Sequence, residues 1–508
     1  MESSRTKNSL RNIGFGMINR VVSILFPFIV RTIFIKTLGE EYLGLNSLYS
    51  SVLQVLNLAD LGFASAIVAS MYKPIADNDV KKVSALMALY KKLYKVIGFC
   101  ILCVGLAITP FISVLISGEP PEDVNIYIVW LLYLANTVVS YLFFAYKVSV
   151  INAHQRSDIT EKIGAVCRIL FSILQIIVVA VFRNIYLYVF LTVINSIAYN
   201  LWCARECDKR YPQYVCSGEL DKATKSQITR NVGALALQKI GNTVSISLDS
   251  IIISAFLGLR IVAIYGNYYY IVSAVSTFIN LIYGAITASI GNSIATESLE
   301  KNYADLKKFF FLNTWLIGWC SICFICLFQD FMSIWMGDKL LFGMGTVFCL
   351  VLRFYFEQIR KVILTYKDAA GMWWADKWRP IVGCLVNLIL NIVMVKAIGV
   401  VGVMLSTVIS YAFVEIPWET HALFKCYFDK SELSYYRQML IATIGLVVSG
   451  VVTYKICTYV CFNHIVSLLI KGVVCAIVPN LIFLLLNIKN SECANGMKFV
   501  KKIIKSSH

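Results

Sequence analysis

Two arginines lie inside the first long apolar segment of the chain, where a charged side chain is costly. Arg20 and Arg31 are eleven residues apart within residues 12–36, and in a helix this spacing makes ~3 turns plus ~20°, so both share one face. A guanidinium near the bilayer centre costs ~3 kcal/mol or more unless it is paired or hydrated. Pro27 lies between them and can bend the helix to open a wet cleft. We predict that both arginines line such a cleft, although Arg31 could instead snorkel to the outer headgroups.

Other apolar segments also carry buried cations. Arg168 lies one or two turns into residues 161–182, and Lys239 shares one face of residues 231–257 with Asp249. The sum of these charges is positive, so a cleft that they line would select an anion. Arginine matches phosphate through its bidentate fork. We predict a cationic substrate site formed by Arg20, Arg31, Arg168 and Lys239.

Three acidic residues are candidates for binding a coupling cation or for pairing with an arginine. They are Asp60, which ends the second apolar segment, Asp249 and Glu357. Glu357 stands four residues after Arg353 and three before Arg360, so a self-neutralised helix surface is an equally good interpretation of that ladder.

The composition defines the elements that must position these charges. Of the 508 residues, 58% are hydrophobic and 15% are charged, against ~45–50% and ~25% in soluble domains. This excludes a disordered chain, a fibrous protein and an ordinary cytosolic enzyme. The net charge of +17 then indicates basic cytoplasmic loops of a membrane protein and not nucleic-acid binding.

Apolar runs of spanning length predict about fourteen transmembrane helices in an all-α, polytopic membrane protein. The expected segments are 12–36, 45–71, 93–117, 125–151, 161–182, 185–204, 231–257, 264–294, 309–335, 341–364, 380–398, 402–424, 438–459 and 464–488. With the N-terminus inside, every inside loop is rich in Lys and Arg, whereas the outside loops are short and poor in them. Both termini are therefore predicted to be cytoplasmic. The first segment lacks a cleavage site and is expected to remain as a helix.

An internal repeat divides the chain. Asn12-Ile-Gly14 opens the first helix and Asn231-Val-Gly233 opens the seventh, and the same offset of 219 pairs Arg20 with Lys239 and Leu38-Gly39 with Leu257-Gly258. Transporters are often two such lobes with the site between them. We predict two pseudo-symmetric six-helix lobes at 1–204 and 231–425, a cytoplasmic linker at 205–230, and two additional helices with a basic tail at 426–508.

The 16 cysteines do not form a disulfide framework, because most lie in apolar runs. The run Cys320-x-x-Cys323-x-x-Cys326 resembles a metal spacing, but it lies in an apolar helix without a Cys or His pair nearby. We expect apolar filling there, and no metal or cofactor anywhere in the chain.

Several short motifs resemble those of Wzx-type polysaccharide-unit flippases, a branch of the multidrug/oligosaccharidyl-lipid/polysaccharide exporter superfamily. Residues 31–49 carry the pattern of an arginine, Leu-Gly, an acidic residue, Tyr, Gly and Leu. The further motifs are Asp60-Leu-Gly-Phe63, Ile334-Trp-Met-Gly337, Ala370-Gly-Met372 with Asp376-Lys377, and Asn387-Leu-Ile-Leu-Asn-Ile392 followed by Ile398-Gly-Val-Val-Gly402 with Thr407. Only Arg31 and Asp60 are matched to the family by position.

The resemblance implies a flippase that moves an undecaprenyl-diphosphate-linked oligosaccharide across a bacterial inner membrane by alternating access, coupled to a proton or sodium gradient. The translocated unit would serve the synthesis of an O-antigen, capsule or exopolysaccharide. A polysaccharide polymerase and a chain-length regulator are the candidate partners.

Three alternatives stay open. They are a multidrug or cation antiporter of the same superfamily, for which an acidic cleft is expected, a peptidoglycan-precursor flippase, and a membrane polymerase, ligase or glycosyltransferase. Against an enzyme, the chain has no large outside loop and no nucleophile–base pair or carboxylate cluster, so no catalytic residue is predicted.

Overall fold

Helices form almost the whole of the computed structural model, which describes residues 2–57, 63–372 and 374–506. For some helical residues in these ranges, among them 231–242, only the backbone is described. Within the described ranges there is no strand. The all-α prediction is therefore confirmed.

The chain divides into two compact units, residues 1–263 (unit 1) and 264–508 (unit 2). Each is considered by itself. Unit 1 contains α1 (Glu2–Thr37), α2 (Glu40–Leu56), α3 (Phe63–Ala76), α4 (Val80–Ile108), η2 (Thr109–Leu115), α5 (Ile126–Leu142), α6 (Ala145–Ala153), α7 (Ser157–Ile177), η3 (Val178–Phe182), α8 (Ile185–Arg210) and α9 (Lys222–Leu257). The helix α10 (Leu259–Thr296) begins in unit 1 and continues in unit 2. Unit 2 then contains α11 (Leu299–Met336), η4 (Asp338–Leu340), α12 (Met344–Ile359), α13 (Lys361–Ala369), α14 (Arg379–Ser410), η5 (Tyr411–Glu415), α15 (Ile416–Leu423), η6 (Phe424–Phe428), α16 (Leu433–Thr458), α17 (His464–Leu486) and α18 (Ser491–Ser506). The lobes and linker expected from the sequence stay a prediction.

The chain is a multi-pass membrane protein. Among the described residues, nine helices are long and apolar enough to cross a membrane, or ten if the bent pair α5 and α6 is one span. The expected segment 341–364 is shorter in the structure, because α12 ends just before Arg360. The expected segments 380–398 and 402–424 form one continuous stretch, Arg379–Phe428, although the backbone is non-helical at Ile398 and Gly399. The count of fourteen therefore stays a prediction.

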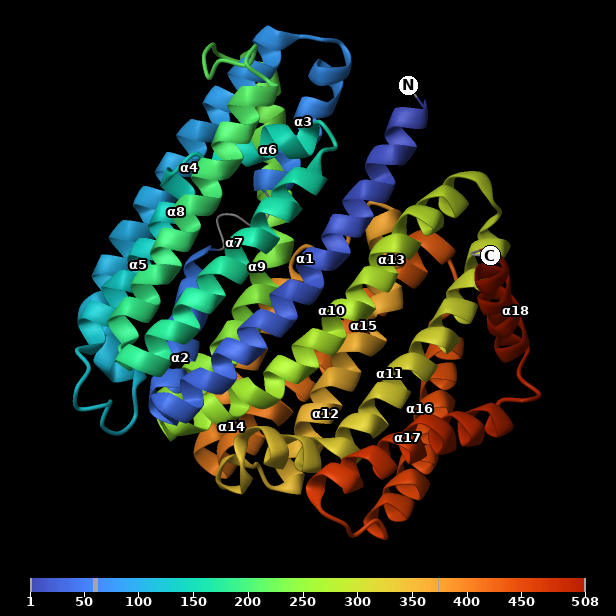
Figure 1. The fold of residues 1–508 in the computed structure, drawn as a ribbon. Coiled ribbons are helices and arrows are strands. Elements are labelled where there is room, and N and C mark those ends of the chain that lie inside the picture. Colours follow the sequence, from blue (N-terminus) through green and yellow to red (C-terminus); the bar gives the residue numbers. More distant parts are fainter. Residues whose placement is uncertain (1, 58–62, 373, 507–508) are drawn as a thin grey trace. The chain divides into compact units, whose positions relative to one another are not determined.

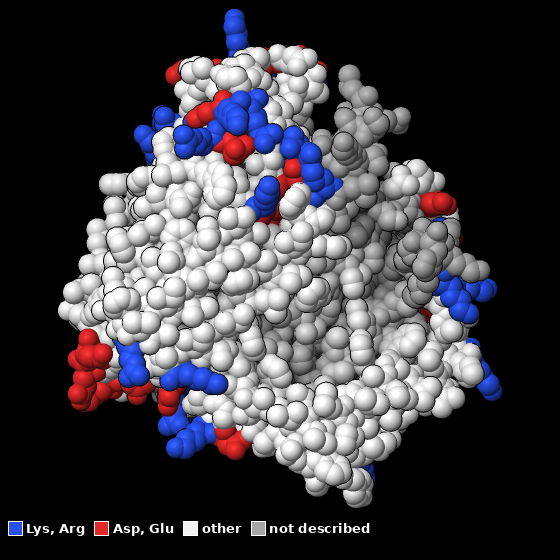
Figure 2. All heavy atoms as spheres, in the orientation of Figure 1, with Lys and Arg blue, Asp and Glu red and all other residues white. Residues whose placement is uncertain are grey.

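Charge follows this membrane pattern in unit 1. On the face drawn in Figure 2, its helices are mostly uncharged along their middle and carry Lys, Arg, Asp and Glu side chains at their ends. Exposed large apolar side chains cover the middle, as in Phe99 of α4 and Leu170 of α7. Such side chains face hydrocarbon at no cost in a bilayer, whereas in water they would form an unusually large apolar surface.

Two glycines break the long helices at matched positions of the repeat. Gly39 (φ 108°) separates α1 from α2, and Gly258 (φ 86°) separates α9 from α10. Both are in the left-handed region, which residues with a side chain rarely adopt. In unit 1, α2 also packs closely on the start of α10, since a Cβ at Gly44 would collide with the carbonyl of Leu259.

Two buried tyrosines are matched by the same offset. The Tyr49 hydroxyl donates to the carbonyl of Ile126, the first residue of α5, at 2.8 Å. The Tyr268 hydroxyl accepts from the backbone N–H of Phe342, two residues before α12, at 3.2 Å. Each tyrosine thus fixes the start of the corresponding helix of its own unit, which supports the internal repeat.

We expect Gly44→Val to destabilise the protein by about 1–3 kcal/mol, because the added carbons have no room against the Leu259 backbone. Thermal unfolding in detergent measures this effect. Gly16→Val is the matched control on α1, where an added Cβ meets no atom within 4 Å. Equal melting temperatures for the two variants would contradict the close packing.

Candidate functional site

Helices α1 and α7 pack against each other in unit 1 (Figure 1), and polar side chains join them near the start of α7. Asn12 donates to the carbonyl of Gln155 at 2.9 Å and accepts from the Asp158 backbone N–H at 2.8 Å, so it caps the start of α7. One to two turns further, Asn19 donates to Glu161 at 2.5 Å. The two helices therefore run parallel in a fixed register.

Charge also gathers at this end of α7. Asp158 forms ion pairs with Arg11 at 2.8 Å and Arg156 at 2.9 Å. The hydrogen bond from Arg156 to Asp158 raises the pKa of the Arg156 guanidinium, against the opposing effect of its partial burial. Arg11 and Arg156 are thus cations held by Asp158 where α7 begins beside α1.

Three of the predicted cations lie on these two helices. Arg20 is exposed on α1, and Arg31 and Arg168 are half-buried on α1 and α7. A Cβ at Gly164 would lie 3.6 Å from the Asn19 side chain, and Arg168 follows Gly164 by about one turn on the same side of α7. In this register Arg168 stands at a level between Arg20 and Arg31.

Arg31 has an aromatic neighbour. Its guanidinium interacts electrostatically with Tyr188 of α8, whose ring packs edge-on against Phe34 with centroids 4.9 Å apart. Arg20, Arg31 and Arg168 thus lie along one packed helix pair, and we refer to these three residues as the arginine row. The backbone of Lys239 belongs to α9, but its side chain is outside the described part of the chain.

The predicted acids are less uniform. Asp60 lies outside the described residues. Asp249 is fully buried on α9, where the nearby Ser247 donates to Gln54 of α2 at 3.3 Å. Glu357 is half-buried on α12 and accepts from Gln358 at 3.3 Å. Asp249 belongs to unit 1 and Glu357 to unit 2, so each is considered with its own unit.

The ladder around Glu357 is largely interior. Arg353 is 1% exposed, donates to the Tyr265 hydroxyl and lies 5.1 Å from the centroid of the Tyr269 ring. A cation over an aromatic face is stabilised by the ring quadrupole. Arg353 therefore does not lie on a solvent-exposed helix surface, and both of its partners belong to α10.

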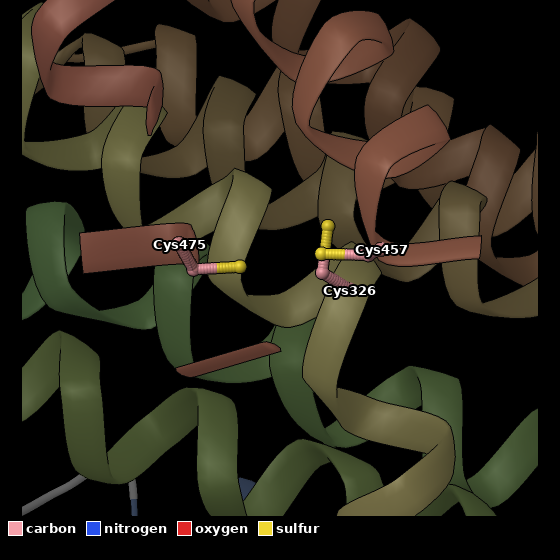
Figure 3. Close-up of side chains that lie close together, drawn as sticks. All are labelled: Cys326, Cys457 and Cys475. Carbon is pink, nitrogen blue, oxygen red and sulfur yellow. The ribbon is translucent and has the colours of Figure 1, made fainter. Parts of the chain in front are cut away.

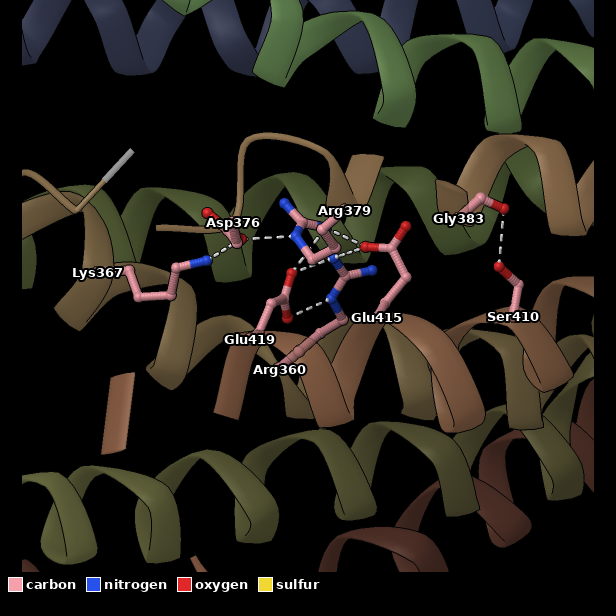
Figure 4. Close-up of polar contacts among 8 residues, drawn as sticks. All are labelled: Arg360, Lys367, Asp376, Arg379, Gly383, Ser410, Glu415 and Glu419. Carbon is pink, nitrogen blue, oxygen red and sulfur yellow. Dashed lines mark hydrogen bonds and ion pairs between the residues drawn. The ribbon is translucent and has the colours of Figure 1, made fainter. Parts of the chain in front are cut away.

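An ion network that the sequence analysis missed lies inside unit 2 (Figure 4). Arg360, at the junction of α12 and α13, bonds Glu419 at 3.0 Å and Glu415 at 2.6 Å. Its guanidinium also lies 4.8 Å from the ring centroid of Tyr411. Arg360 is 4% exposed and Glu419 is fully buried.

A second arginine completes the network. Arg379, the first residue of α14, bonds Asp376 at 2.7 Å, pairs with Glu419 at 2.8 Å and contacts Glu415. Asp376 also pairs with Lys367 of α13. Three cations thus meet three carboxylates in a site shielded from water, so the network neutralises itself. Removing one member would leave a buried charge uncompensated.

Local backbone irregularities position the two glutamates. The π-helical turn η5 ends at Glu415, and Pro417 stands in the first turn of α15, two residues before Glu419. π-helical turns often occur at functional sites. The missing side chain of Gly383 leaves room for the Glu415 carboxylate. A signal was present in the sequence, because two acids four residues apart interrupt the apolar segment 402–424.

A buried polar ladder continues along α14. Asn387 donates to Thr407 at 3.0 Å, Asn391 donates to Asn387 at 3.2 Å, and Ser406 donates to Asn391. The chain reverses between the two legs at Gly399 (φ 62°). The asparagine and threonine of the sequence motif thus hold the two legs together, which is a packing role.

These features define a class. Apolar spanning helices that keep many ionisable side chains in their interior are typical of membrane transporters and flippases. The family model described as "Polysaccharide biosynthesis protein" matches residues 9–287, more than half of the chain. The chain therefore belongs to the polysaccharide biosynthesis protein family.

Solved structures share the fold. A lipid II flippase MurJ in an inward closed conformation is 14% identical with a TM-score of 0.68, over 94% of this chain and 99% of that one. An inward-facing multidrug resistance MATE family transporter of the MOP superfamily is 16% identical with a TM-score of 0.60, over 80% and 97%. A MOP superfamily transporter from Pyrococcus furiosus is 14% identical with a TM-score of 0.56, over 84% and 97%. Comparison with curated proteins found no match.

We expect Arg360→Met to destabilise the protein by about 3–5 kcal/mol, because Glu415 and Glu419 would lose a buried counter-charge. Lys425→Met, which removes an exposed cation of the same region, should change stability by about 0–1 kcal/mol. Thermal unfolding in detergent compares them.

A double-mutant cycle isolates the pair. Adding Glu419→Gln to Arg360→Met should cost less than the sum of the single effects by about 0.5–3 kcal/mol, because both partners of one ion pair are then gone. Additive effects, or similar melting of Arg360→Met and Lys425→Met, would refute a cooperative buried network.

Proposed function

We propose that the protein is a flippase for an undecaprenyl-diphosphate-linked oligosaccharide used in surface polysaccharide synthesis. The observation that carries the proposal is the arginine row, found on one packed helix pair of a polysaccharide biosynthesis family member. A lipid-linked sugar has an anionic diphosphate, a polar head and an apolar tail. The row supplies the partner for the diphosphate.

The mechanism follows from the cost of moving a polar head through lipid. Each unsatisfied polar group costs several kcal/mol in hydrocarbon. In our proposal the diphosphate is held by the arginine row, with Lys239 as a further partner, while the isoprenoid tail stays in the bilayer. Rocking of the lobes then exposes the head to the opposite side.

Coupling and location are part of the same proposal. Asp60, Asp249 and Glu357 are the candidate carboxylates for a coupling proton or sodium ion. The protein would lie in a bacterial inner membrane with both termini cytoplasmic, as the Lys- and Arg-rich loops predict. A polysaccharide polymerase and a chain-length regulator would use the translocated unit, and the protein itself would perform no enzymatic step.

The alternative of a multidrug antiporter is disfavoured by the sign of the charge in unit 1, because a cationic drug calls for an acidic site. The Pyrococcus furiosus transporter is described as having a binding pocket of reverse polarity that suggests a different function. Polarity is thus a reasonable guide to cargo within this fold. A lipid II flippase also binds a lipid diphosphate, so the arginine row fits that alternative as well.

We expect Arg20→Ala and Arg168→Ala each to reduce surface glycan by about 10–100-fold, the loss of a charge-assisted contact of about 1.5–3 kcal/mol. Membrane insertion and protein level should stay unchanged. The assay is complementation of a deletion strain, read as surface glycan. Arg205→Ala is the matched control, since Arg205 is an exposed arginine of α8. Full complementation by both variants would remove the arginine row from the site.

Deletion of the gene distinguishes the alternatives. The proposal predicts that undecaprenyl-linked sugar units accumulate on the cytoplasmic leaflet. Accumulation of peptidoglycan precursor, with rescue of a strain that lacks its own precursor flippase, would assign the protein to lipid II instead. Hypersensitivity to cationic dyes with normal glycan would assign it to drug export.

A further inference from the structure

Three cysteine thiols converge inside unit 2 from three different helices, and a fourth thiol contacts one of them. Cys326 of α11, Cys457 of α16 and Cys475 of α17 are buried, and their sulfur atoms all lie within 4.8 Å of one another (Figure 3). The Cys475 thiol also contacts the thiol of Cys323, one turn before Cys326 on α11. We refer to these four residues as the thiol cluster.

The cluster corrects one argument made from the sequence. The run Cys320-x-x-Cys323-x-x-Cys326 was expected to lack partner ligands, because no Cys or His pair is nearby in sequence. Packing of α16 and α17 against α11 brings Cys457 and Cys475 to two of its three thiols. The partners are more than 130 residues away in the chain, so spacing could not reveal them.

The surroundings of the thiol cluster are apolar on one side and charged on the other. Ile322, Leu327 and Val474 pack around it. One turn along their helices from Cys326 and Cys475, Asp330 pairs with Lys471 at 2.6 Å. Lys471 also interacts electrostatically with Cys457 and Cys475. A cation therefore stands beside the place where negative charge on sulfur would collect.

The donor set matches one kind of ligand. Thiolates at ~2.3 Å from a tetrahedral Zn(II) lie ~3.8 Å from one another, which is compatible with the spacing of the Cys326, Cys457 and Cys475 sulfur atoms. Soft thiolates select Zn(II) or Cu(I) over hard cations such as Mg(II) or Ca(II). Zn(II) with four thiolates carries a net charge of −2, and the nearest cation described, Lys471, faces the site as one half of its ion pair with Asp330.

We propose that Cys323, Cys326, Cys457 and Cys475 form a structural site for a thiophilic d10 metal ion, with Zn(II) as the expected occupant. The ion would tie the C-terminal helices α16 and α17 to α11. Binding requires loss of the thiol protons to solvent and involves no change of oxidation state.

The test uses the full chain, purified in detergent under reducing conditions, with metal content measured by mass spectrometry. We expect about one Zn(II) per chain, and a thiolate-to-metal charge-transfer absorption when Co(II) replaces it. Cys475→Ser and Cys457→Ser should lower the bound metal at least fivefold. Cys349→Ser is the matched control, since Cys349 is a buried thiol of α12 outside the cluster, and it should keep the metal.

A measurement on the parent chain guards against variants that fail to fold. Removal of metal by a chelator should lower the melting temperature, and stoichiometric Zn(II), but not Mg(II), should restore it. Uptake of Cu(I) in place of Zn(II) at the same cysteines would also support a thiophilic site. A chain that takes up neither ion, a disulfide between any two of the four cysteines, or unchanged metal in Cys475→Ser would overturn the proposal.

Discussion

The need to compensate a charge in hydrocarbon governs this protein. An ion that leaves water must find a counter-ion, hydrogen bonds or a wet cleft, and in lipid the alternatives are few. Unit 2 meets the requirement internally, because Arg360 and Arg379 face Glu415 and Glu419 at hydrogen-bonding distance. A network that is already neutral has little charge left to offer a ligand.

Unit 1 meets the requirement differently. Arg20 is exposed along the α1–α7 pair, and cations outnumber carboxylates in these two helices. Asp158 pairs with Arg11 and Arg156, whereas Glu161 accepts from the uncharged amide of Asn19. Positive charge at this surface therefore suits an anionic cargo, which is why the proposed function depends on unit 1.

Much of the fold followed from composition and repeat, because apolar length and turn glycines are local properties. The helical, multi-pass architecture and the breaks at Gly39 and Gly258 are examples. The unit 2 network was not predicted, because Glu415 and Glu419 reach Arg360 only when α15 packs beside α13. The thiol cluster was missed for the same reason: its ligands come from three helices that only tertiary packing brings together.

The most direct test of the central claim is the water accessibility of position 20. Arg20→Cys should react in intact membranes with a charged, membrane-impermeant thiol reagent, followed at that peptide by mass spectrometry. Leu25→Cys, on the exposed apolar side of the same helix, should stay unreactive. An unreactive position 20, or equal reactivity at positions 20 and 25, would contradict a hydrated site on this helix pair.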